Sequence, residues 1–158
     1  MKIVIDTREQ APFPFSGEQY RGTEIAFGTL DTGDYSLAGL TDRVAVERKS
    51  LPDLVACLGR ERERFERELV RAAALESFAV VVEDTWEALA RGQYRSQLNP
   101  VAACQSVCAF MARLKVPFLF AGSRPAAEYV CHSLLRQYLE GARKRYKSIL
   151  RAHGDEAA

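Results

Sequence analysis

The sequence predicts an α/β protein built as a three-layer α/β/α sandwich, with helices on both faces of a central mixed sheet. Short apolar segments typical of strands alternate along the chain with longer segments of helical periodicity, which is the pattern of that fold class. The 158 residues, 47% of them hydrophobic, can bury one substantial core. We therefore expect a single domain over residues 1–158, with a core from residue 3 to about residue 140 and a C-terminal helix to about residue 150.

The N-terminal third of the chain is expected to supply most of the sheet. A loop from Gln10 to Gly22, rich in Pro, Gly and Phe, separates the first strand from the next. Residues 39–42 form a turn that joins the last two strands into an antiparallel hairpin. The expected strands span residues 2–6, 23–28, 33–38 and 44–49.

Helices and further strands are expected to alternate in the rest of the chain. Ser50 is a plausible N-cap and Pro52 lies in the first turn of a helix over 51–57, which Gly59 ends. The helix over 100–115 is apolar around its circumference, so we expect it to be buried. The other expected elements are helices over 60–75, 85–91 and 125–149 and strands over 78–83 and 117–121.

The strand over residues 44–49 carries the most informative side chains. Alternation along a strand places Glu47 and Lys49 on one face, and Val44 and Val46 on the other. If the hairpin turns back as expected, the carboxylate of Asp34 lies beside Glu47. Two carboxylates and a lysine would then meet at the hairpin edge of the sheet.

Two close carboxylates repel each other, and a divalent cation that prefers oxygen ligands relieves the repulsion. The expected cation is Mg²⁺ or Mn²⁺, and an adjacent lysine suits phosphoryl chemistry because it can neutralise charge that develops on phosphorus. The alternative is a surface hairpin whose charged end is simply solvated. Chance weighs against that alternative, because a Glu-Arg-Lys-x-x-x-Asp spacing arises by accident in roughly a few per thousand chains of this length.

The motifs resemble those of the XPF-type structure-specific endonucleases. Gly33-Asp34 followed by Glu47-Arg48-Lys49-x-x-x-Asp53 reproduces the GD…ERKxxxD signature of that family, and Asp6-Thr7-Arg8-Glu9 is similar to its DxRE element. The resemblance covers roughly residues 3 to 140. It implies the restriction-endonuclease-like fold.

The resemblance also implies roles for individual residues. It assigns the metal ligands to Asp34, Glu47 and the main-chain carbonyl of Arg48, and the catalytic lysine to Lys49. Asp53 and Asp6 would complete the acidic rim. The candidate DNA contacts near this site are Arg8, Glu9 and Arg48, with Arg8 the favoured phosphate contact.

Two basic segments are further candidates for DNA binding. The net charge is only +1, so attraction to DNA must come from local patches. One of Arg60, Arg62 or Arg64 would contact the DNA backbone; the alternative is a solvated, salt-bridged helix. The second segment contains Arg143, Lys144 and Arg145, whose alternative role is to complement the helix dipole.

The aromatic loop at Phe13 and Phe15 also allows two interpretations. It could wedge against unpaired bases, or it could cover the edge of the sheet.

The function expected from these features is divalent-metal-dependent cleavage of DNA at a flap, branch or junction, in repair or recombination. The alternative is a non-catalytic DNA-binding or scaffold domain that serves a partner nuclease or helicase. Unlike larger family members, the chain has no room for a tandem helix-hairpin-helix region, so a stand-alone nuclease domain is expected. A homodimer through helices 100–115 and 125–140 and a helicase or recombination partner are both compatible with the sequence.

The sequence also predicts where the protein works. No apolar run approaches the roughly 20 residues of a membrane span, so a membrane partner is not expected. The N-terminal apolar segment is interrupted by a charged residue too early to be a secretory signal. Arginine outnumbers lysine by 17 to 5, a ratio that hints at a GC-rich bacterial or phage genome. The expected location is the cytoplasm, in association with the nucleoid.

Overall fold

One mixed sheet forms the centre of the molecule. The structure, a computed structural model, describes residues 1–154, and within them the sheet has six strands in the order β2-β1-β3-β4-β5-β6. β3 runs antiparallel to its neighbours β1 and β4, while the other adjacent pairs are parallel. The strands are β1 (Lys2–Asp6), β2 (Glu24–Gly28), β3 (Tyr35–Leu37), β4 (Val44–Lys49), β5 (Ser77–Val82) and β6 (Phe118–Phe120). The predicted α/β class with a mixed sheet is confirmed.

Every predicted helix is present, with ends that differ from the prediction by a few residues. The helices are α1 (Leu51–Leu58), α2 (Arg62–Ala72), α3 (Trp86–Ala90), α4 (Pro100–Leu114) and α5 (Arg124–His153), with a short 3-10 turn η1 (Glu18–Tyr20) in the N-terminal loop. Local chemistry explains where two of them begin. The Ser50 hydroxyl accepts a hydrogen bond from the Asp53 amide and caps α1, and the Asn99 side chain caps α4 in the same way.

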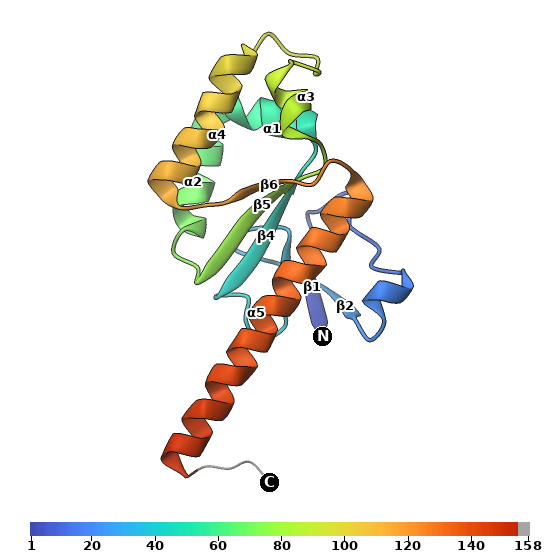
Figure 1. Cartoon of the computed structure of the whole chain (residues 1–158), viewed down its shortest axis with the longest axis vertical. Coiled ribbons are helices and arrows are strands. Elements are labelled where there is room, and N and C mark those ends of the chain that lie inside the picture. Colours follow the sequence, from blue (N-terminus) through green and yellow to red (C-terminus); the bar gives the residue numbers. More distant parts are fainter. Residues whose placement is uncertain (155–158) are drawn as a thin grey trace.

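The helices form two layers on opposite faces of the sheet (Figure 1). α1, α2 and α4 lie on one side, and α5 crosses the other side over β3, β4 and β5. The strand alternation expected for β4 is confirmed, because Ala45 packs in the core beneath the helical layer while Val44 and Val46 pack in the core beneath α5. The sheet is therefore buried on both faces around β4.

The helix α5 continues well beyond the body of the protein (Figure 1). Its last fully buried residue is Leu135, Tyr138 and Leu139 still pack against the core, and residues 143–149 are exposed. Within residues 1–154, no helix combines the length and the apolar character needed to cross a bilayer.

The expectation that the helix over 100–115 is buried was wrong. α4 packs against α1, α2 and α3, and only one of its faces is covered. Ala103, Val107 and Phe110 are buried along that face, whereas Val101 is 69% and Met111 40% exposed. An apolar composition predicted burial, but it does not reveal whether the helix lies inside a layer or outside it.

The aromatic loop is part of the core. Phe13 and Phe15 are 1% and 6% exposed, and the Phe13 ring stacks on Tyr35 with centroids 5.1 Å apart. The Phe13 amide also donates to the Tyr35 hydroxyl, at 2.9 Å. The covering role is thus confirmed, and the base-wedge interpretation was wrong because neither ring reaches the surface.

Candidate active site

The hairpin of β3 and β4 brings the two predicted carboxylates together, at the centre of the sheet rather than at its margin. Tyr35 pairs with Val46, so the preceding Asp34 lies opposite Glu47. The Asp34 amide donates to the Val46 carbonyl at 2.9 Å, which extends the ladder by one residue. The site thus lies where two inner strands end, which gives it a rigid support on both sides.

Gly33 makes this placement of Asp34 possible. Its φ of +79° lies in the left-handed region of the backbone map, which residues other than glycine rarely adopt. A Cβ atom at this position would lie 2.9 Å from the Ala45 Cβ and 3.2 Å from the Val46 carbonyl oxygen. The Gly-Asp pair in the motif therefore has a steric cause, since the backbone of Gly33 passes directly against β4.

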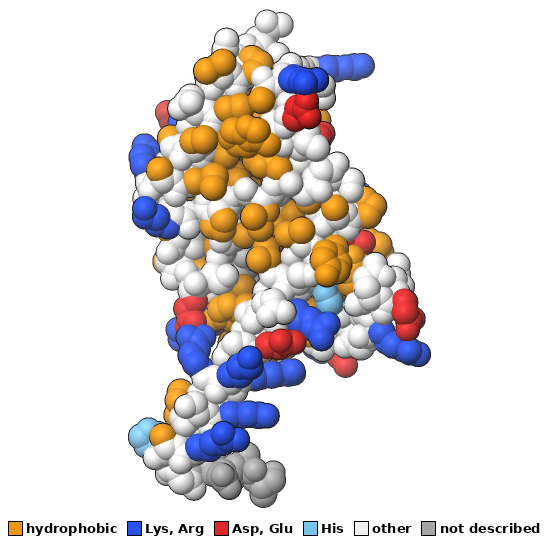
Figure 2. All heavy atoms as spheres, in the orientation of Figure 1, with side chains coloured by type: hydrophobic (Ala, Val, Ile, Leu, Met, Phe, Trp, Pro, Cys, Tyr) orange, Lys and Arg blue, Asp and Glu red, His pale blue; other side chains and the backbone are white. Residues whose placement is uncertain are grey.

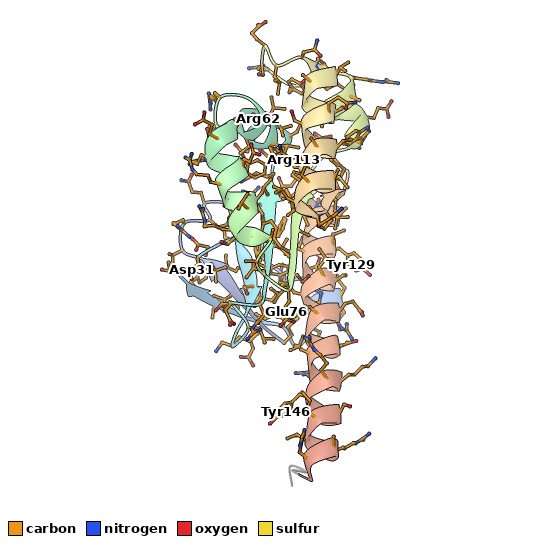
Figure 3. All side chains as sticks on the ribbon, turned by 90° about the vertical axis from the view of Figure 1, so that its left-hand side faces the viewer. Asp31, Arg62, Glu76, Arg113, Tyr129 and Tyr146 are labelled. Atoms are coloured by element: carbon orange, nitrogen blue, oxygen red, sulfur yellow. The ribbon has the colours of Figure 1, made fainter. Side chains whose placement is uncertain are left out.

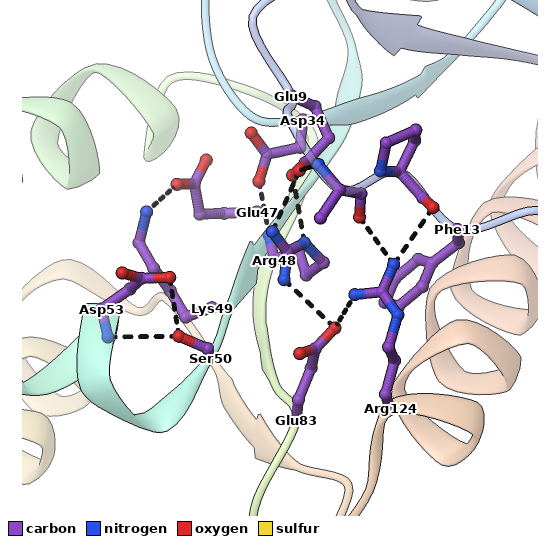
Figure 4. A network of polar contacts seen from close by, with 12 residues as sticks. Glu9, Phe13, Asp34, Glu47, Arg48, Lys49, Ser50, Asp53, Glu83 and Arg124 are labelled. Atoms are coloured by element: carbon purple, nitrogen blue, oxygen red, sulfur yellow. Dashed lines mark hydrogen bonds and ion pairs between the residues drawn. The ribbon is translucent and has the colours of Figure 1, made fainter. Parts of the chain in front are cut away.

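Glu47, Asp34 and Lys49 form the floor of the site. Glu47 is 3% exposed, and the Lys49 ammonium donates a hydrogen bond to its carboxylate. One Asp34 carboxylate oxygen accepts a hydrogen bond of 2.7 Å from the Arg48 amide. Figure 4 shows the three side chains approaching one another from neighbouring positions on the hairpin.

The electrostatics of this floor are unfavourable for two negative charges. Burial raises the pKa of Glu47, and the nearby Asp34 carboxylate raises it further. Burial also raises the pKa of Asp34, although the Arg48 amide and Lys49 oppose the change. Burial lowers the pKa of Lys49, but the attraction and hydrogen bond of Glu47, together with the attraction of Asp34 and other nearby groups, raise it overall. The lysine thus stays charged while the carboxylates compete for protons.

This donor set fits a divalent metal ion with oxygen ligands. Asp34, Glu47 and the Arg48 main-chain carbonyl would hold it, and a dication would stabilise both carboxylates in the ionised form that their burial disfavours. Residues 1–154 contain no cluster of three His, Cys, Asp or Glu side chains, so such an ion would depend on the backbone oxygen and on water or substrate for its other ligands.

A polar cleft of about 300 Å³ opens above these residues. Basic and acidic side chains from the loop after β1, from the residue before β3, and from β4, α1 and α2 surround it, so the cleft suits a charged ligand. Its lining residues are Arg8, Glu9, Gln10, Asp34, Arg48, Lys49, Asp53, Ala56, Cys57, Arg60, Glu61 and Arg64.

Asp53 lies at the rim of this cleft, at the N-terminus of α1. Its carboxylate accepts a hydrogen bond of 2.6 Å from the Ser50 hydroxyl, and its amide donates back to the same oxygen at 3.2 Å. The exposed side chain is therefore fixed by the helix cap and lines the cleft. This is the placement that the sequence predicts.

Asp6 has a different environment from the one expected. Its carboxylate forms two hydrogen bonds with the Arg8 guanidinium, at 2.8 and 2.9 Å, and accepts the Leu30 amide at 2.7 Å. The hydrogen bonds from Arg8 lower its pKa to about 2. Asp6 is 2% exposed, and its amide donates to the Asp34 carbonyl at 2.8 Å, so the two residues are neighbours in the sheet. Its carboxylate, however, is bound by Arg8 and the Leu30 amide and does not line the cleft.

Comparison with known families identifies the domain. A model of the ERCC4 domain matches residues 5–133, which is most of the chain. The chain belongs to the ERCC4 domain family. The expected XPF-type nuclease domain is thereby confirmed. Comparison with curated proteins gave no match.

Solved structures share the fold of this ERCC4 domain. XPF from Aeropyrum pernix has a TM-score of 0.69 at 21% identity, with 87% of this chain and 61% of that chain covered. XPF from Aeropyrum pernix in complex with DNA has a TM-score of 0.68 at 22% identity, with 89% and 66% covered. The chain thus spans under two thirds of the length of these structures. The predicted restriction-endonuclease-like fold is confirmed.

A charged network, which sequence reasoning missed, supports the cleft wall of the ERCC4 domain. Two nitrogens of Arg48 donate hydrogen bonds of 3.0 and 3.1 Å to Glu9, and its third guanidinium nitrogen lies 3.1 Å from Glu83. Arg124 bonds the same Glu83 oxygen at 2.5 Å and reaches the carbonyls of Ala11 and Pro12 (Figure 4). Arg48 and Glu9 therefore use most of their hydrogen-bonding groups on each other, and fewer of these groups are free to contact DNA.

The sequence indicates this network only weakly. Glu83 directly follows the apolar strand β5, and Arg124 stands in the first turn of α5. Each position is compatible with an ordinary surface charge, and the two residues are 41 positions apart. Their role is visible only in the structure, where Glu83 joins Arg124 to Arg48.

The basic candidates separate into two groups. Arg60 and Arg64 line the cleft with side chains 81% and 72% exposed. Arg62 turns away, donates to the Ser106 hydroxyl at 2.7 Å and lies over the Phe110 ring at 4.9 Å, so it joins α2 to α4. The segment Arg143-Lys144-Arg145 lies on the distal part of α5, away from the cleft.

Proposed function

We propose that this ERCC4 domain is a divalent-metal-dependent endonuclease that hydrolyses DNA phosphodiester bonds. The observation that carries the proposal is that Asp34 and Lys49 line a cleft with arginines on its rim, while the buried Glu47 lies opposite Asp34 and is hydrogen-bonded to Lys49. A non-catalytic DNA-binding or scaffold domain is the alternative. It would leave a buried carboxylate pair, whose mutual repulsion costs stability, without a task.

Each residue of the site has a role in this proposal. Asp34, Glu47 and the Arg48 carbonyl hold Mg²⁺ or Mn²⁺, which would polarise the phosphodiester and lower the pKa of an attacking water. Lys49, held charged by Glu47, stabilises negative charge at the reacting phosphate or orients the water. Arg8, Arg60 and Arg64 bind backbone phosphates along the rim.

The proposed substrate is DNA with a branch, flap or junction between single strand and duplex. The structurally similar XPF from Aeropyrum pernix binds DNA in one of its solved structures, which supports DNA as the ligand class here. The preference for branched DNA rests on the XPF-type resemblance, and it places the enzyme in DNA repair or recombination. Such an enzyme would act in the cytoplasm, at the nucleoid of a bacterium or on phage DNA, where a helicase or recombination protein could deliver the branched substrate.

A homodimer is the second part of the proposal. Figure 2 shows hydrophobic side chains spread over α4, β6 and the proximal part of α5. The exposed members on the two helices include Val101, Met111 and Tyr129, at 69%, 40% and 57%. A second copy of the chain is the proposed occupant, because XPF-type nucleases often pair through this domain. Light scattering that compares the mass of the wild type with that of the Val101→Glu/Met111→Glu variant tests the homodimer. The wild type should be dimeric and the variant monomeric; a wild type that is monomeric at all concentrations would refute the homodimer.

Cleavage of labelled flap, splayed-arm, four-way-junction and plain duplex DNA tests the enzymatic proposal. Each substrate is incubated with Mg²⁺, Mn²⁺ or EDTA, beside the Lys49→Ala variant. Metal-dependent cuts that the variant does not make are the expected result. Binding of the same substrates without any cut, with either metal, would instead favour the scaffold function.

A further inference from the structure

The distal part of α5 carries a concentrated positive charge. Residues 141–154 include five Lys and Arg residues and no Asp or Glu. Arg136, Arg143, Lys147 and Arg151 follow one another at spacings of seven, four and four residues, which places them within a helical sector of about 80°. All four are exposed, and Figure 2 shows the basic side chains gathered along this end of the molecule. We call these four residues the α5 stripe.

The stripe begins in a groove on the body of the protein. A polar pocket of about 240 Å³ lies between α5 and the turn that precedes β2, and Arg21, Arg136 and Arg143 contribute to its walls. Two carboxylates partly neutralise this positive charge, because Arg136 pairs with Glu140 at 3.2 Å and Arg21 pairs with Glu18 at 3.0 Å. Arg143 and the cations beyond it belong to a segment without carboxylates, so the net charge of the surface is positive.

Arg145 is not part of this surface. It points to the opposite side of α5, where its guanidinium lies 2.9 Å from the Glu76 carboxylate. Tyr138 donates to the same carboxylate at 2.9 Å, and Figure 3 shows Glu76 beside this part of the helix. These contacts fix the rotation of α5 about its axis, so that Arg143, Lys147 and Arg151 lie on a side of the helix that faces away from Glu76.

We infer that the α5 stripe is a second DNA-binding surface, which holds the phosphate backbone of a duplex arm while the cleft holds the reacting strand. This inference rests on the proposed nuclease function. The stripe from Arg136 to Arg151 is about 22 Å long, which matches roughly six base pairs of duplex. A rigid helix with cations at regular spacing and no base-reading geometry suits contacts to phosphates, which carry no sequence information.

A duplex fits the stripe better than a membrane surface does. The side of the distal helix that lacks the stripe has few large apolar residues, with Tyr146 and Ile149 exposed at 61% and 55%. Helices that bind in the plane of a membrane bury a continuous apolar face, and two such residues supply little of it. Several cations without neighbouring acids supply what a polyanion requires.

The geometry also sets a minimum length for the duplex arm. Arg124, which is joined to the cleft wall through Glu83, and Arg143 are 19 residues apart on α5, a distance of about 28 Å along the helix axis. That length corresponds to about eight base pairs. An arm shorter than this cannot reach Arg143, Lys147 and Arg151 from the cleft, although Arg136 at the start of the stripe lies only about 18 Å along the helix axis from Arg124.

Fluorescence anisotropy in EDTA tests the inference, because binding is then measured without cleavage. The probe is a flap DNA whose duplex arm has about 6 or about 20 base pairs, titrated between about 50 and 300 mM salt. Wild type is expected to bind the long arm about tenfold more tightly than the short arm. The triple variant Arg143→Gln/Lys147→Gln/Arg151→Gln should lose this difference, and its salt slope on the long arm should be smaller by about 3.

A matched control removes the same charge elsewhere. Arg71→Gln/Arg91→Gln/Arg113→Gln changes three exposed arginines on α2, α4 and the end of α3, far from the stripe in sequence. It should keep both the preference for the long arm and the salt slope. Equal losses in the two triple variants, or none in the stripe variant, would overturn the inference.

Three further outcomes can be told apart. If the stripe variant binds weakly but cleaves with a raised KM and an unchanged kcat, the stripe holds substrate as inferred. If wild type cleaves in a metal-dependent manner and the stripe variant binds normally, this inference fails while the nuclease function stands. Stripe-dependent sedimentation with vesicles containing phosphatidylserine, together with unchanged DNA binding, would assign the stripe to a membrane and overturn it as well.

Discussion

Buried carboxylates occur in two places at the same end of the sheet, and their environments are opposite. Asp6 at the end of β1 has its oxygens occupied by the Arg8 guanidinium and the Leu30 amide, and its pKa falls to about 2. Asp34 and Glu47 lie beside each other on the neighbouring hairpin, and the pKa of each is raised. The first site is electrostatically complete, while the second still requires positive charge.

This difference separates a structural acid from a candidate catalytic acid. Both types belong to the same sequence signature, so the motif alone assigns them together. A carboxylate whose oxygens already accept several donors has little to gain from a metal ion, whereas a repelling pair has much to gain. We therefore expect substitutions at the two sites to have opposite effects on activity and stability.

The largest expected effect is loss of cleavage when the repelling pair or its lysine is changed. Glu47→Gln and Lys49→Ala should each lower metal-dependent cleavage by about a thousandfold or more, because they remove charge that the transition state requires. Glu47→Gln should change the Tm in EDTA little, because it removes the repulsion with Asp34 but also the ion pair with Lys49. Cleavage assays and thermal denaturation of the same samples check both statements; wild-type turnover by either variant contradicts the assignment.

Asp6→Asn should show the reverse pattern. It removes the ionic partner of Arg8 and weakens the acceptor of the Leu30 amide, so the free energy of unfolding should fall by about 2 kcal/mol. Urea denaturation measures this loss. Residual metal-dependent cleavage under folding conditions should stay above that of Glu47→Gln. If Asp6→Asn were as stable as the wild type but inactive, Asp6 would be a catalytic residue like Asp34 and Glu47.

The dependence of stability on pH should differ between the two sites as well. The lowered pKa of Asp6 contributes stability above its ordinary 3.8, and this contribution is lost as the pH falls toward about 2. The raised pKa values of Asp34 and Glu47, about 6 and about 8, favour the folded state in acid, and that contribution is lost as the pH rises through those values. In EDTA the Tm should therefore fall between pH 5 and pH 8.

Two additions sharpen this pH experiment. Glu47→Gln should flatten the fall in Tm between pH 5 and pH 8, and Mg²⁺ should raise the wild-type Tm more at pH 8 than at pH 5, because the ionised carboxylates bind it. Asp6→Asn should leave the alkaline part of the curve unchanged and alter only the acid part. A wild-type curve that is flat above pH 5 in EDTA contradicts the proposed repulsion.

What the sequence could predict depended on how local each feature is. β4 and α1 follow from alternation over six residues and from the Ser50 cap, and the meeting of Asp34 with Glu47 follows from a short hairpin. The exposed face of α4 and the turning of Arg62 toward Ser106 depend on which elements pack together. No local pattern in a single sequence shows which helices and strands pack against one another.

The network on Arg48 was hidden for the same reason, and it offers the smallest expected effect. Arg124→Gln removes the bonds that tie α5 to Glu83 and to the carbonyls of Ala11 and Pro12. Because this arginine is partly exposed, the stability cost should be about 1 kcal/mol or less. Arg113→Gln, which changes an exposed arginine outside the network, is the control.

The informative readout for Arg124→Gln is local. Amide hydrogen exchange should become faster at Phe13 and Phe15, whose amides bond to Tyr35 and Glu128, while the amides of β5 keep their protection. Cleavage should fall only a few-fold, since Glu9 still pairs with Arg48 and the carboxylate floor is untouched. Faster exchange throughout β5 would mean that Arg124 supports the whole core. Unchanged exchange at Phe13 and Phe15 would mean that the aromatic loop is held by its buried rings alone, and that the network serves only to orient Arg48.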